Sequence, residues 1–410
     1  MNLDTDILEK ILPTIKNSHQ QHSLQNAINI GFPTMKQEEW KYTYYNKILQ
    51  QGFSFKTAEH TQTSSITKEF IDANATSSNR IVFINGIFHN EFSSLVNHPK
   101  INFWNSNNAT ESNTAEFLVE INNALSTDGI FLEIGDHVIV DEPIEIFYLS
   151  DNNQAIINLK NKIIVGKNAQ VKFTEYAINT QQAATYNNIV TSINVAENAN
   201  VEFYKIQDGG AGFYSTDNTF VQQAAKSVCN ITTLSLSGEI IRNVLQFDIN
   251  GERAAAHMNG LYLLQQNEHV DNRTLVNHNV ANCESFELYK GILGGTSTGV
   301  FNGKIVVKQA AQKTNAFQSN RNLMLSNDAN IYTKPQLEIF ADDVKCSHGA
   351  TSSQIEDSEL FYLQARGIGK TTARGLLVFA FGEEIVEMIK PEALKIRMEK
   401  RIAELLNIEF

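Results

Sequence analysis

The sequence predicts a mainly β fold: a right-handed parallel β-helix (solenoid) flanked by N-terminal and C-terminal α-helical segments. From residue 80 to about residue 351, runs of five to eight strand-forming residues recur, separated by Asn, Asp and Gly. Roughly 270 residues of short strands exceed what one β-sandwich usually holds. A stack of repeated units is therefore the better prediction, with helical periodicity mainly at the two ends of the chain.

An internal repeat supports the solenoid. The segments Val165–Phe173 and Val195–Phe203 match in residue type at most positions, 30 residues apart. The pairs that would stack are Val165 with Val195, Ala169 with Ala199, Val171 with Val201, and Phe173 with Phe203. Ladders of like residues are how a solenoid fills its interior. Asn168 and Asn198 would form tight corners, because Asn tolerates left-handed backbone angles. Residues 327–331 resemble a third, imperfect copy.

The first 79 residues are predicted to form an N-terminal helical cap and linker. Apolar residues at helical spacing are Leu3, Ile7, Leu8, Ile11, Leu12 and Ile15. Pro13 interrupts this pattern, which resumes from Ser18 to Ile30 and ends at Gly31–Thr34. Trp40 and Tyr42 are expected to pin the cap onto the core; an aromatic binding platform is the alternative. Residues 51–79 are polar and are expected to form a loop with a short helix.

Residues 80–355 are predicted to form the β-helix core. The expected strands include Arg80–Ile84, Ile130–Ile134, His137–Val140, Ile144–Leu149, Ala155–Leu159, Lys162–Val165 and Gln170–Tyr176. Residues 113–126 are an exception, because their apolar positions fit one face of a helix.

Residues 356–410 are predicted to form a C-terminal helical domain. A first helix would start at Asp357 or Ser358 and stop at Gly367. A second would run from Thr371 or Thr372 to Ile389 and end before Pro391, and a third from Glu392 to Leu406. Such a block can cap the end of a solenoid or present a surface to a partner.

Composition narrows the possible functions. The 410 residues include 42% hydrophobic and 19% charged residues, which is typical of a protein with a sizeable core. A net charge of -12 argues against nucleic acid and anionic membrane surfaces as partners, and favours basic protein partners or simple solubility. Three widely spaced cysteines, without a Cys-x-x-Cys pair, indicate neither a disulfide framework nor a closed metal site. No signal peptide or membrane-spanning run is apparent, so we expect a cytoplasmic protein.

The stretch Thr333–Thr351 contains the main candidate site. It begins as a strand, with Pro335 tolerable only where the strand starts. Cys346 and His348 follow two residues apart, so an extended backbone puts both side chains on one face. Sulfur and imidazole ligands suit a transition metal or an iron–sulfur species. Two ligands are fewer than the usual four, and a buried cysteine beside a hydrogen-bonded histidine is the structural alternative. Gly349 would serve a bend or a close neighbour.

Other candidate ligands are His257, His269, His278 and Cys283, which lie on expected strands. They could bind a metal, but we favour a structural interpretation, with the histidines as polar ladder residues and Cys283 as a buried thiol. The segment Gly367–Thr372 has some features of a phosphate-binding loop, but its glycine spacing is wrong and no strand leads into it. We interpret it as a corner between helices.

Several motifs occur in one order along the C-terminal half. They are Tyr289-Lys290-Gly291, Val300-Phe301-Asn302-Gly303, Gln318-Ser319-Asn320-Arg321-Asn322-Leu323, Thr333–Thr351, Leu360-Phe361-Tyr362-Leu363 and Arg366-Gly367-Ile368. Together they resemble the SufB/SufD family of scaffold subunits of the SUF iron–sulfur cluster assembly machinery. The segment Lys345–Gly349 (Lys-Cys-Ser-His-Gly) is similar to the SufD branch of that family. The N-terminal segments Gly31–Thr34 and Glu38–Thr43 resemble the same family, which also implies a β-helix.

The resemblance implies a non-catalytic scaffold subunit that pairs with a SufB-like paralogue and docks a SufC-like ATPase. The functional histidine of the family maps onto His348, at the interface with the paralogue and beside a cysteine that the partner supplies. Cys346 matches as well. A nascent iron–sulfur cluster would be bound there in the complex, and the chain alone would hold no metal or cofactor tightly. The helices after Asp357 would dock the ATPase.

Two other functions remain open from the sequence. One is a homodimeric β-helix structural protein, because edge strands of a solenoid readily pair with a second copy. A homodimer in isolation would also be compatible with a scaffold. The other is a carbohydrate-active β-helix enzyme, which would need a cleft of aromatic and carboxylate side chains along the solenoid. The sequence offers no clear case for such a cleft.

Overall fold

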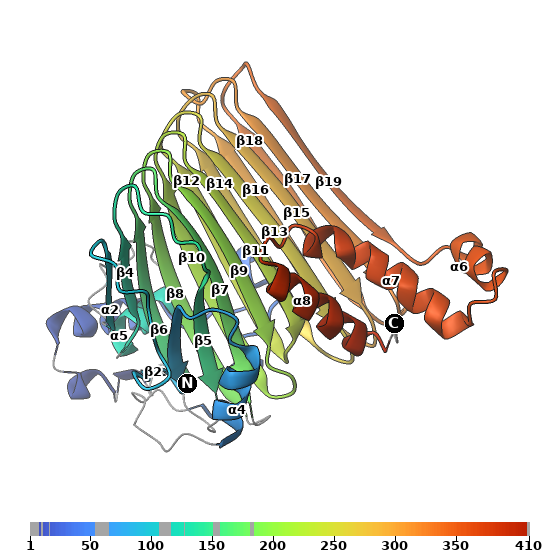
Figure 1. Cartoon of the computed structure of the whole chain (residues 1–410), viewed down its shortest axis with the longest axis horizontal. Coiled ribbons are helices and arrows are strands. Elements are labelled where there is room, and N and C mark those ends of the chain that lie inside the picture. The colour runs from blue at the N-terminus through green and yellow to red at the C-terminus, as the bar shows by residue number, and fades with distance from the viewer. Residues whose placement is uncertain are drawn as a thin grey trace.

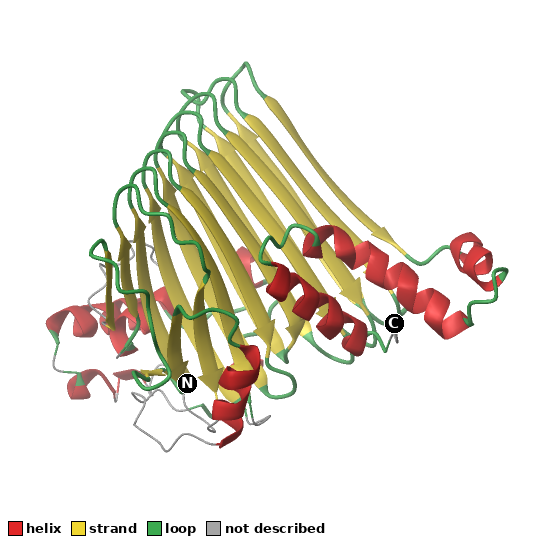
Figure 2. Cartoon of the chain, viewed as in Figure 1, coloured by secondary structure: helices red, strands yellow, loops and turns green. Residues whose placement is uncertain are grey.

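The computed structural model describes residues 8, 9, 11–15, 17–53, 65–105, 116–126, 128–150, 156–180 and 184–407. These residues form a parallel β-solenoid, with helices near both ends of the chain (Figure 1). Figure 2 shows long strands running side by side, joined by loops that line up along the upper edge of the coil. The predicted mainly β solenoid with terminal helices is therefore confirmed.

The strands belong to two sheets. Ten strands form the first sheet in the described chain, in spatial order: β19 (Lys345–Ser353), β17 (Asn315–Met324), β15 (Glu284–Leu293), β13 (Ala255–Leu264), β11 (Val228–Ser237), β9 (Asn200–Asp208), β7 (Gln170–Asn179), β5 (Ile144–Ser150), β1 (Arg80–Ile84) and β2 (Ile87–Phe88). Nine form the second: β18 (Asn330–Ile339), β16 (Thr298–Val307), β14 (His269–His278), β12 (Ile240–Ile249), β10 (Phe213–Gln223), β8 (Thr185–Val195), β6 (Ile156–Val165), β4 (Ile130–Ile134) and β3 (Ile101–Asn105).

Successive strands alternate between the sheets from β4 onward, so each turn of the coil adds one strand to each sheet. Strands β5 to β18 make seven such turns in the described chain. Neighbouring strands are parallel except for the pairs β1 with β2 and β3 with β4, which are antiparallel. Each strand from β5 to β17 therefore has a hydrogen-bonded neighbour on both sides.

The predicted ladder of like residues is confirmed. Val171 pairs with Val201, and Phe173 pairs with Phe203 at a ring-centroid distance of 5.2 Å. Asn168 and Asn198 both have a positive φ at the corner before these strands, and the Asn198 side chain donates to Asn168 Oδ1 over 2.6 Å. The same left-handed corner recurs before the later strands of the first sheet, at Lys226, Arg253, Asn282 and Lys313.

The third copy is only partly present. Ala329 is buried in the same core, but residues 327–330 contain no non-glycine residue with a positive φ. The corner before β18 is therefore built differently from the two that the repeat predicts.

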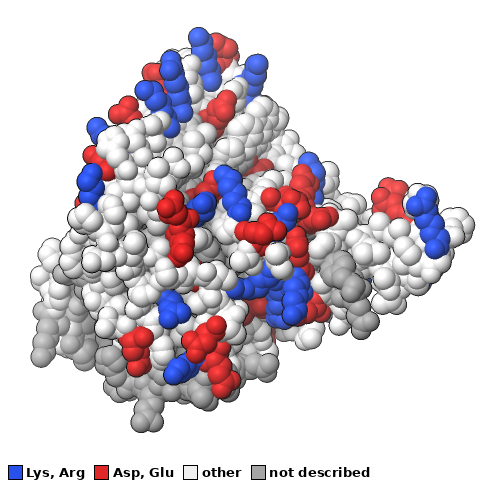
Figure 3. Space-filling model, viewed as in Figure 1, with Lys and Arg blue, Asp and Glu red and all other residues white. Residues whose placement is uncertain are grey.

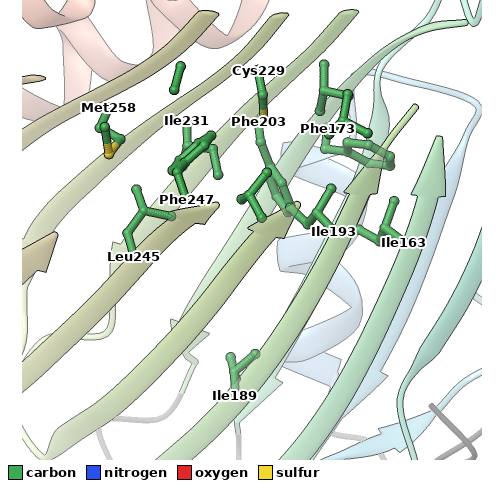
Figure 4. Packing of buried hydrophobic residues seen from close by; sticks show 14 of the residues in the cluster. Ile163, Phe173, Ile189, Ile193, Phe203, Cys229, Ile231, Leu245, Phe247 and Met258 are labelled. Carbon is green, nitrogen blue, oxygen red and sulfur yellow. The ribbon is translucent and has the colours of Figure 1, made fainter. Parts of the chain in front are cut away.

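The main core lies between the two sheets. Figure 4 shows Phe173 and Phe203 from the first sheet close to Ile163 and Ile193 from the second, all of them buried. The core continues along the coil through Phe247 and the residues of later turns. Because every turn repeats the same inward positions, burial of apolar surface accumulates turn by turn.

Helices and short helical turns lie outside the coil. In the described residues they are η1 (Leu12–Thr14), α2 (Ser18–Ile30), η2 (Glu38–Trp40), α3 (Asn46–Leu49), α4 (Ser65–Asn74), α5 (Phe117–Leu125), α6 (Asp357–Gln364), α7 (Lys370–Val386) and α8 (Glu392–Leu405). Helices α2 and α5 cover part of the second sheet, where Leu24 and Leu118 share an apolar cluster with Tyr186. Helices α7 and α8 cover part of the first sheet, where Ile385 and Ile402 join a cluster with strand residues.

The N-terminal segment is anchored as predicted. Asn17 caps α2 by accepting from the backbone N–H of His19, and the helix ends at Ile30. Trp40 is buried, and its ring stacks on the guanidinium of Arg242 in β12. Tyr42 stacks on Tyr332 of β18 at a ring-centroid distance of 4.1 Å. The predicted role of Trp40 and Tyr42 in pinning the N-terminal segment onto the core is confirmed, and the contacts extend to the last strand of the second sheet.

Some local predictions differ from the structure. Residues 137–140 form a turn with one isolated bridge, because His137 adopts a left-handed φ that a strand cannot continue. The two strands expected around residues 155–159 and 162–165 are one strand, β6. Pro335 lies in the middle of β18 and not at its start. The helices α6 and α7 begin at Asp357 and Lys370 without a side-chain cap.

A few predictions lie outside the described residues. These include Leu3, Ile7, the start of the segment expected to be helical at residues 113–126, and residues 54–64 of the expected loop. The domain boundaries drawn after residues 79 and 355 stay predictions.

The coil interior also buries an ionic cluster. Lys205 lies 2.6 Å from Asp217 and 3.2 Å from Glu175, and all three side chains are almost inaccessible to solvent. Burial raises the pKa of Glu175 to about 7, although Lys205 opposes this shift. Removing one partner of a buried ion pair leaves an uncompensated charge in a medium that solvates it poorly. The cluster is therefore sensitive to loss of its only cation.

We expect Lys205→Met to lower the free energy of unfolding by about 3 to 5 kcal/mol at pH 7.5, because two carboxylates would remain buried without a cation. Urea unfolding followed by circular dichroism measures this change. Lys226→Met is the matched control, since Lys226 pairs with Glu197 on the exposed side of the coil at 3.8 Å. A Lys205→Met midpoint no lower than that of the control would contradict the prediction.

Candidate functional site

The coil ends at β18 and β19, and each of these strands has a neighbour on one side only. Lys345 donates its backbone N–H toward β17. In a parallel ladder alternate residues face opposite edges, so the backbone groups of Cys346, His348, Ala350 and Ser352 face the free edge. The helices that follow pack on the outer face of the first sheet and leave this edge uncovered in the described chain.

The free edge of β18 is different. Asn330 and Phe340 donate their N–H groups toward β16, so the backbone groups of the odd-numbered residues of β18 face its free edge. Pro335 is one of them and has no N–H to offer. The proline is tolerated in mid-strand because its missing donor lies on an edge, which corrects the sequence-based expectation. Of the two terminal strands, β19 therefore offers the less interrupted row of backbone groups.

Cys346 and His348 lie on β19 as the sequence predicts, at alternate positions and thus on the same face. Cys346 pairs in register with Ala316, and His348 with Gln318. Ala316 and Gln318 are buried inside the coil, so these two ladders lead from the interior to the exposed last turn. His348 is exposed and Cys346 is half-buried.

The Cys346 thiol packs against the main core. Burial raises its pKa, and a hydrogen bond to the backbone of Ala316 only partly opposes this effect. A thiol needs to lose its proton to bind iron. Cys346 is therefore poorly prepared to act as a ligand in the chain alone, whereas the exposed imidazole of His348 needs no rearrangement of the core.

Two buried polar side chains, Gln318 and Glu287, lie beneath His348. Gln318 donates its Nε2 to Glu287 Oε2 over 3.1 Å, and Thr274 donates its hydroxyl to the same oxygen over 2.6 Å. Burial raises the pKa of Glu287 to about 7, although both hydrogen bonds lower it. No cation pairs with this carboxyl group in the described chain. The interior next to the candidate site thus holds a carboxyl group that burial keeps protonated to a higher pH than usual.

Gly349 does not fulfil its predicted purpose. It lies within β19, where there is no bend, and a methyl group added there would have nothing within 4 Å. The glycine that leaves space for a side chain near the candidate site is Gly303 on β16. A Cβ at this position would lie 2.2 Å from Gln318 Nε2, so the glycine provides the space that the carboxamide occupies.

The last turn of the coil exposes several apolar side chains. They include Phe317, Tyr332, Ile339 and Phe340. On the outer face, His257, Phe286 and Phe317 stack on one another in register and line a cleft of about 470 Å³ with Met388. Exposed apolar surface next to an unpaired strand is typical of a protein interface.

The other candidate ligands do not converge. His278 contacts Ser285 inside the coil, His269 contacts Thr43 of the N-terminal segment, and His257 stacks on Phe286. Cys283 is buried. No group of three or more His, Cys, Asp and Glu side chains able to hold a metal ion is found among the residues that the structure describes. The geometry therefore supports structural roles, and not metal binding, for these three histidines and Cys283.

The roles of Glu287 and Thr274 could not be read from the sequence. Glu287 lies in a strand of alternating residue types, Ser285-Phe286-Glu287-Leu288, and a period of two does not say which set faces inward. The register shows that Glu287 follows Met258 and precedes Gln318 in an inward ladder. Of Glu287, Thr274 and Gln318, only Gln318 was marked in the sequence, because it begins one of the motifs that resemble the family.

Comparisons with known proteins agree with this architecture. A model of the SUF system FeS cluster assembly SufBD core domain matches residues 147–381, and a model of the SufBD protein N-terminal region matches residues 3–146. The iron–sulfur cluster assembly protein SufD of Escherichia coli is 28% identical, covering 96% of this chain and 94% of its own length. An iron–sulfur cluster assembly SufBD family protein of Synechocystis is 31% identical, covering 92% and 88%. SufD of Bacillus subtilis is 24% identical over 68% of this chain.

We expect Glu287→Gln to change how stability depends on pH. The pKa of Glu287 is about 7 in the folded chain and near its ordinary value of 4.5 in the unfolded chain. The folded state therefore holds this proton more tightly, and its contribution to stability, complete below pH 4.5, is lost as the pH rises to 7. Glutamine cannot ionise, so the variant should gain on the order of 3 kcal/mol relative to the wild-type chain between pH 4.5 and pH 7.5.

Urea unfolding of both chains at several pH values measures that difference. The comparison between the two chains cancels the opposite effect of His269 and His278, whose pKa values burial lowers to about 4. A difference that stays constant with pH would show that Glu287 has the same pKa in both states.

Proposed function

This chain belongs to the SufBD family of SUF-system iron–sulfur cluster assembly proteins, and we propose that it acts as a scaffold subunit that supplies one half of a cluster assembly site. The observation that carries this proposal is the open last turn of the coil. There the exposed imidazole of His348 and the half-buried thiol of Cys346 lie on one face of an unpaired strand. The cluster is the cargo of this site.

The ligand set explains why a second subunit is required. One imidazole and one thiol fall short of the four ligands that iron–sulfur clusters usually take. We propose that a SufB-like paralogue adds a strand at the free edge of β19 and brings the missing ligands, including a cysteine. A split site also suits transient binding, because separating the subunits removes half of the ligands at once.

Strand addition at β19 is supported by its backbone. Its outward groups form a continuous row, whereas Pro335 interrupts the row on β18. The neighbouring exposed side chains of Phe317 and Phe340 would be buried by such a partner. Backbone pairing would supply orientation, and apolar contact would supply most of the affinity.

A second surface fits the docking of a SufC-like ATPase. Helix α6 projects away from the coil (Figure 1), and none of its residues is buried. Phe361 is 71% exposed and Tyr362 is 55% exposed. In Figure 3 this projecting end is mainly uncharged, apart from one small group of Lys or Arg and Asp or Glu side chains. Exposed aromatic side chains are frequent anchors of protein interfaces.

In this proposal the chain itself is non-catalytic, and the ATPase supplies the chemical step of ATP hydrolysis. We propose that ATP hydrolysis moves the helices α6 and α7. Their movement would be transmitted to the last turns of the coil, because α7 packs against β13 and β15. No helix in the described part of the chain is long and apolar enough to cross a membrane.

A homodimer is the second function that the geometry favours. The same free edge and the same exposed apolar residues could pair with a second copy of this chain. We propose that such a dimer forms in isolation and is replaced by the paralogue when both are present. Together, the two copies would offer two imidazoles and two thiols, one His348 and one Cys346 from each copy.

We expect His348→Ala to reduce cluster formation in the complex with the paralogue and the ATPase by about tenfold or more, because a side chain that contacts the cluster is lost. Anaerobic cluster yield, measured by absorbance and by iron content, tests this. Ser347→Ala is the matched control, because Ser347 is the preceding residue of the same strand and faces the opposite side. An unchanged yield in His348→Ala would refute the half-site.

We expect the double change Phe361→Ser and Tyr362→Ser to weaken capture of the ATPase by about tenfold or more, since two exposed aromatic anchors are removed. Binding of the purified ATPase, measured by calorimetry, checks this. Point changes on α6 are used because complete removal of residues 357–410 would also uncover the apolar cluster of the first sheet that α7 and α8 cover. Ile396→Ser, on an exposed position of α8, serves as the control.

A further inference from the structure

Three polar residues form one inward-facing ladder at the end of the coil. Glu287 of β15, Gln318 of β17 and His348 of β19 are consecutive partners in the register of the first sheet. The two preceding members of this ladder, Ile231 and Met258, are apolar and buried in the core. The change from apolar to polar residues occurs only in the last three strands, directly beneath the candidate site.

The hydrogen bonds of this ladder are directional. Gln318 commits its Nε2 to Glu287 Oε2, at 3.1 Å, and Glu287 is held in turn by the hydroxyl of Thr274. Both Glu287 and Gln318 are only 3% exposed. The Oε1 atom of Gln318 is buried and has no hydrogen-bond partner among the described residues. A buried carbonyl oxygen without a donor is unfavourable, so this atom calls for a partner.

The opposite wall of the coil is shaped to fit this carboxamide. Gly303 of β16 faces it, and a Cβ at that position would lie 2.2 Å from Gln318 Nε2 and 2.7 Å from its amide carbon. The glycine therefore fixes where the Gln318 side chain can lie. With its nitrogen bonded to Glu287, the free acceptor of Gln318 is left for the next member of the ladder, which is His348.

A histidine that binds a metal usually donates its second ring N–H to a carboxylate or carbonyl oxygen, which selects the tautomer and orients the ring. We propose that Glu287 and Gln318 are positioning residues for His348. Gln318 Oε1 accepts one ring N–H of His348, and the other ring nitrogen is thereby left deprotonated and directed to the iron–sulfur cargo. Glu287 acts through Gln318 by keeping the carboxamide from turning over.

This inference rests on the proposed function for its purpose but not for its test. The hydrogen bond belongs to the chain alone, and it can be measured without a cluster, a paralogue or an ATPase. His348 and Gln318 are partners in the register of the last two strands of the first sheet, so their side chains are neighbours on one face.

The experiment is side-chain nitrogen NMR of the full-length chain labelled with ¹⁵N-histidine, with the His348 signals assigned from a His348→Gln variant. We expect the wild-type His348 to show one dominant tautomer. Gln318→Leu removes the acceptor, and Gly303→Ala displaces it while leaving every polar group in place. Both variants should convert His348 to the tautomer mixture of an exposed imidazole.

Two variants of Glu287 separate its role in orienting the Gln318 side chain from the effect of its charge. Glu287→Gln keeps an acceptor for Gln318 Nε2 and should retain the single tautomer, whereas Glu287→Leu should lose it. Ser319→Ala, on the opposite face of β17, is the control and should have no effect. Thermal unfolding of each variant confirms that the last turns remain folded.

Two results would overturn the proposal: a wild-type His348 that already shows the mixture of an exposed imidazole, or a single tautomer that persists in Gln318→Leu and Gly303→Ala. Either result leaves the half-site intact if His348→Ala still loses cluster formation. In the assembled complex, Gln318→Leu should slow cluster formation by about tenfold or more. If the tautomer changes but His348→Ala has no effect on cluster formation, the proposed function fails and the hydrogen bond stands.

Discussion

Each strand of the coil pairs its backbone with the strand one turn earlier and the strand one turn later, and this constraint leaves the last turn without a partner on one side. Helices could have covered the open end, but α7 and α8 pack on the outer face of the first sheet. The free edge of β19 follows from how the solenoid is built, and the candidate ligands lie on it. An edge that is a liability in most proteins becomes the natural place for a second subunit to bind.

The inward ladder that ends at His348 changes character toward that end. Its earlier members are apolar, among them the stacked Phe173 and Phe203 and the buried Ile231 and Met258. In the last turns Glu287, Gln318 and Asn320 occupy inward positions, with Gly303 making room for the carboxamide. Apolar residues would stabilise the same positions at a lower electrostatic cost. Polar groups beneath an exposed imidazole instead provide hydrogen bonds that can orient it.

The N-terminal segment also contributes to this end of the molecule. It crosses the outer face of the second sheet, where Trp40 stacks on Arg242, and it reaches β18 through the stacked rings of Tyr42 and Tyr332. Lys334 of β18 pairs with Glu38 at 2.5 Å. The edge strand of the second sheet is therefore held by residues from the start of the chain, whereas β19 has no such brace in the described residues. The two terminal strands differ in restraint as well as in backbone pattern.

The sequence by itself determined the periodic parts of this protein. The 30-residue repeat predicted the ladders and corners at Asn168 and Asn198, and the spacing of Cys346 and His348 predicted one face of a strand, because both follow from local backbone geometry. Only the tertiary structure decided what depends on contacts between distant strands. These features are the mid-strand Pro335 on a free edge, the space that Gly303 leaves for Gln318, and the inward placement of Glu287. A period of two fixes which residues share a face, but register and packing decide whether that face is the core or the solvent.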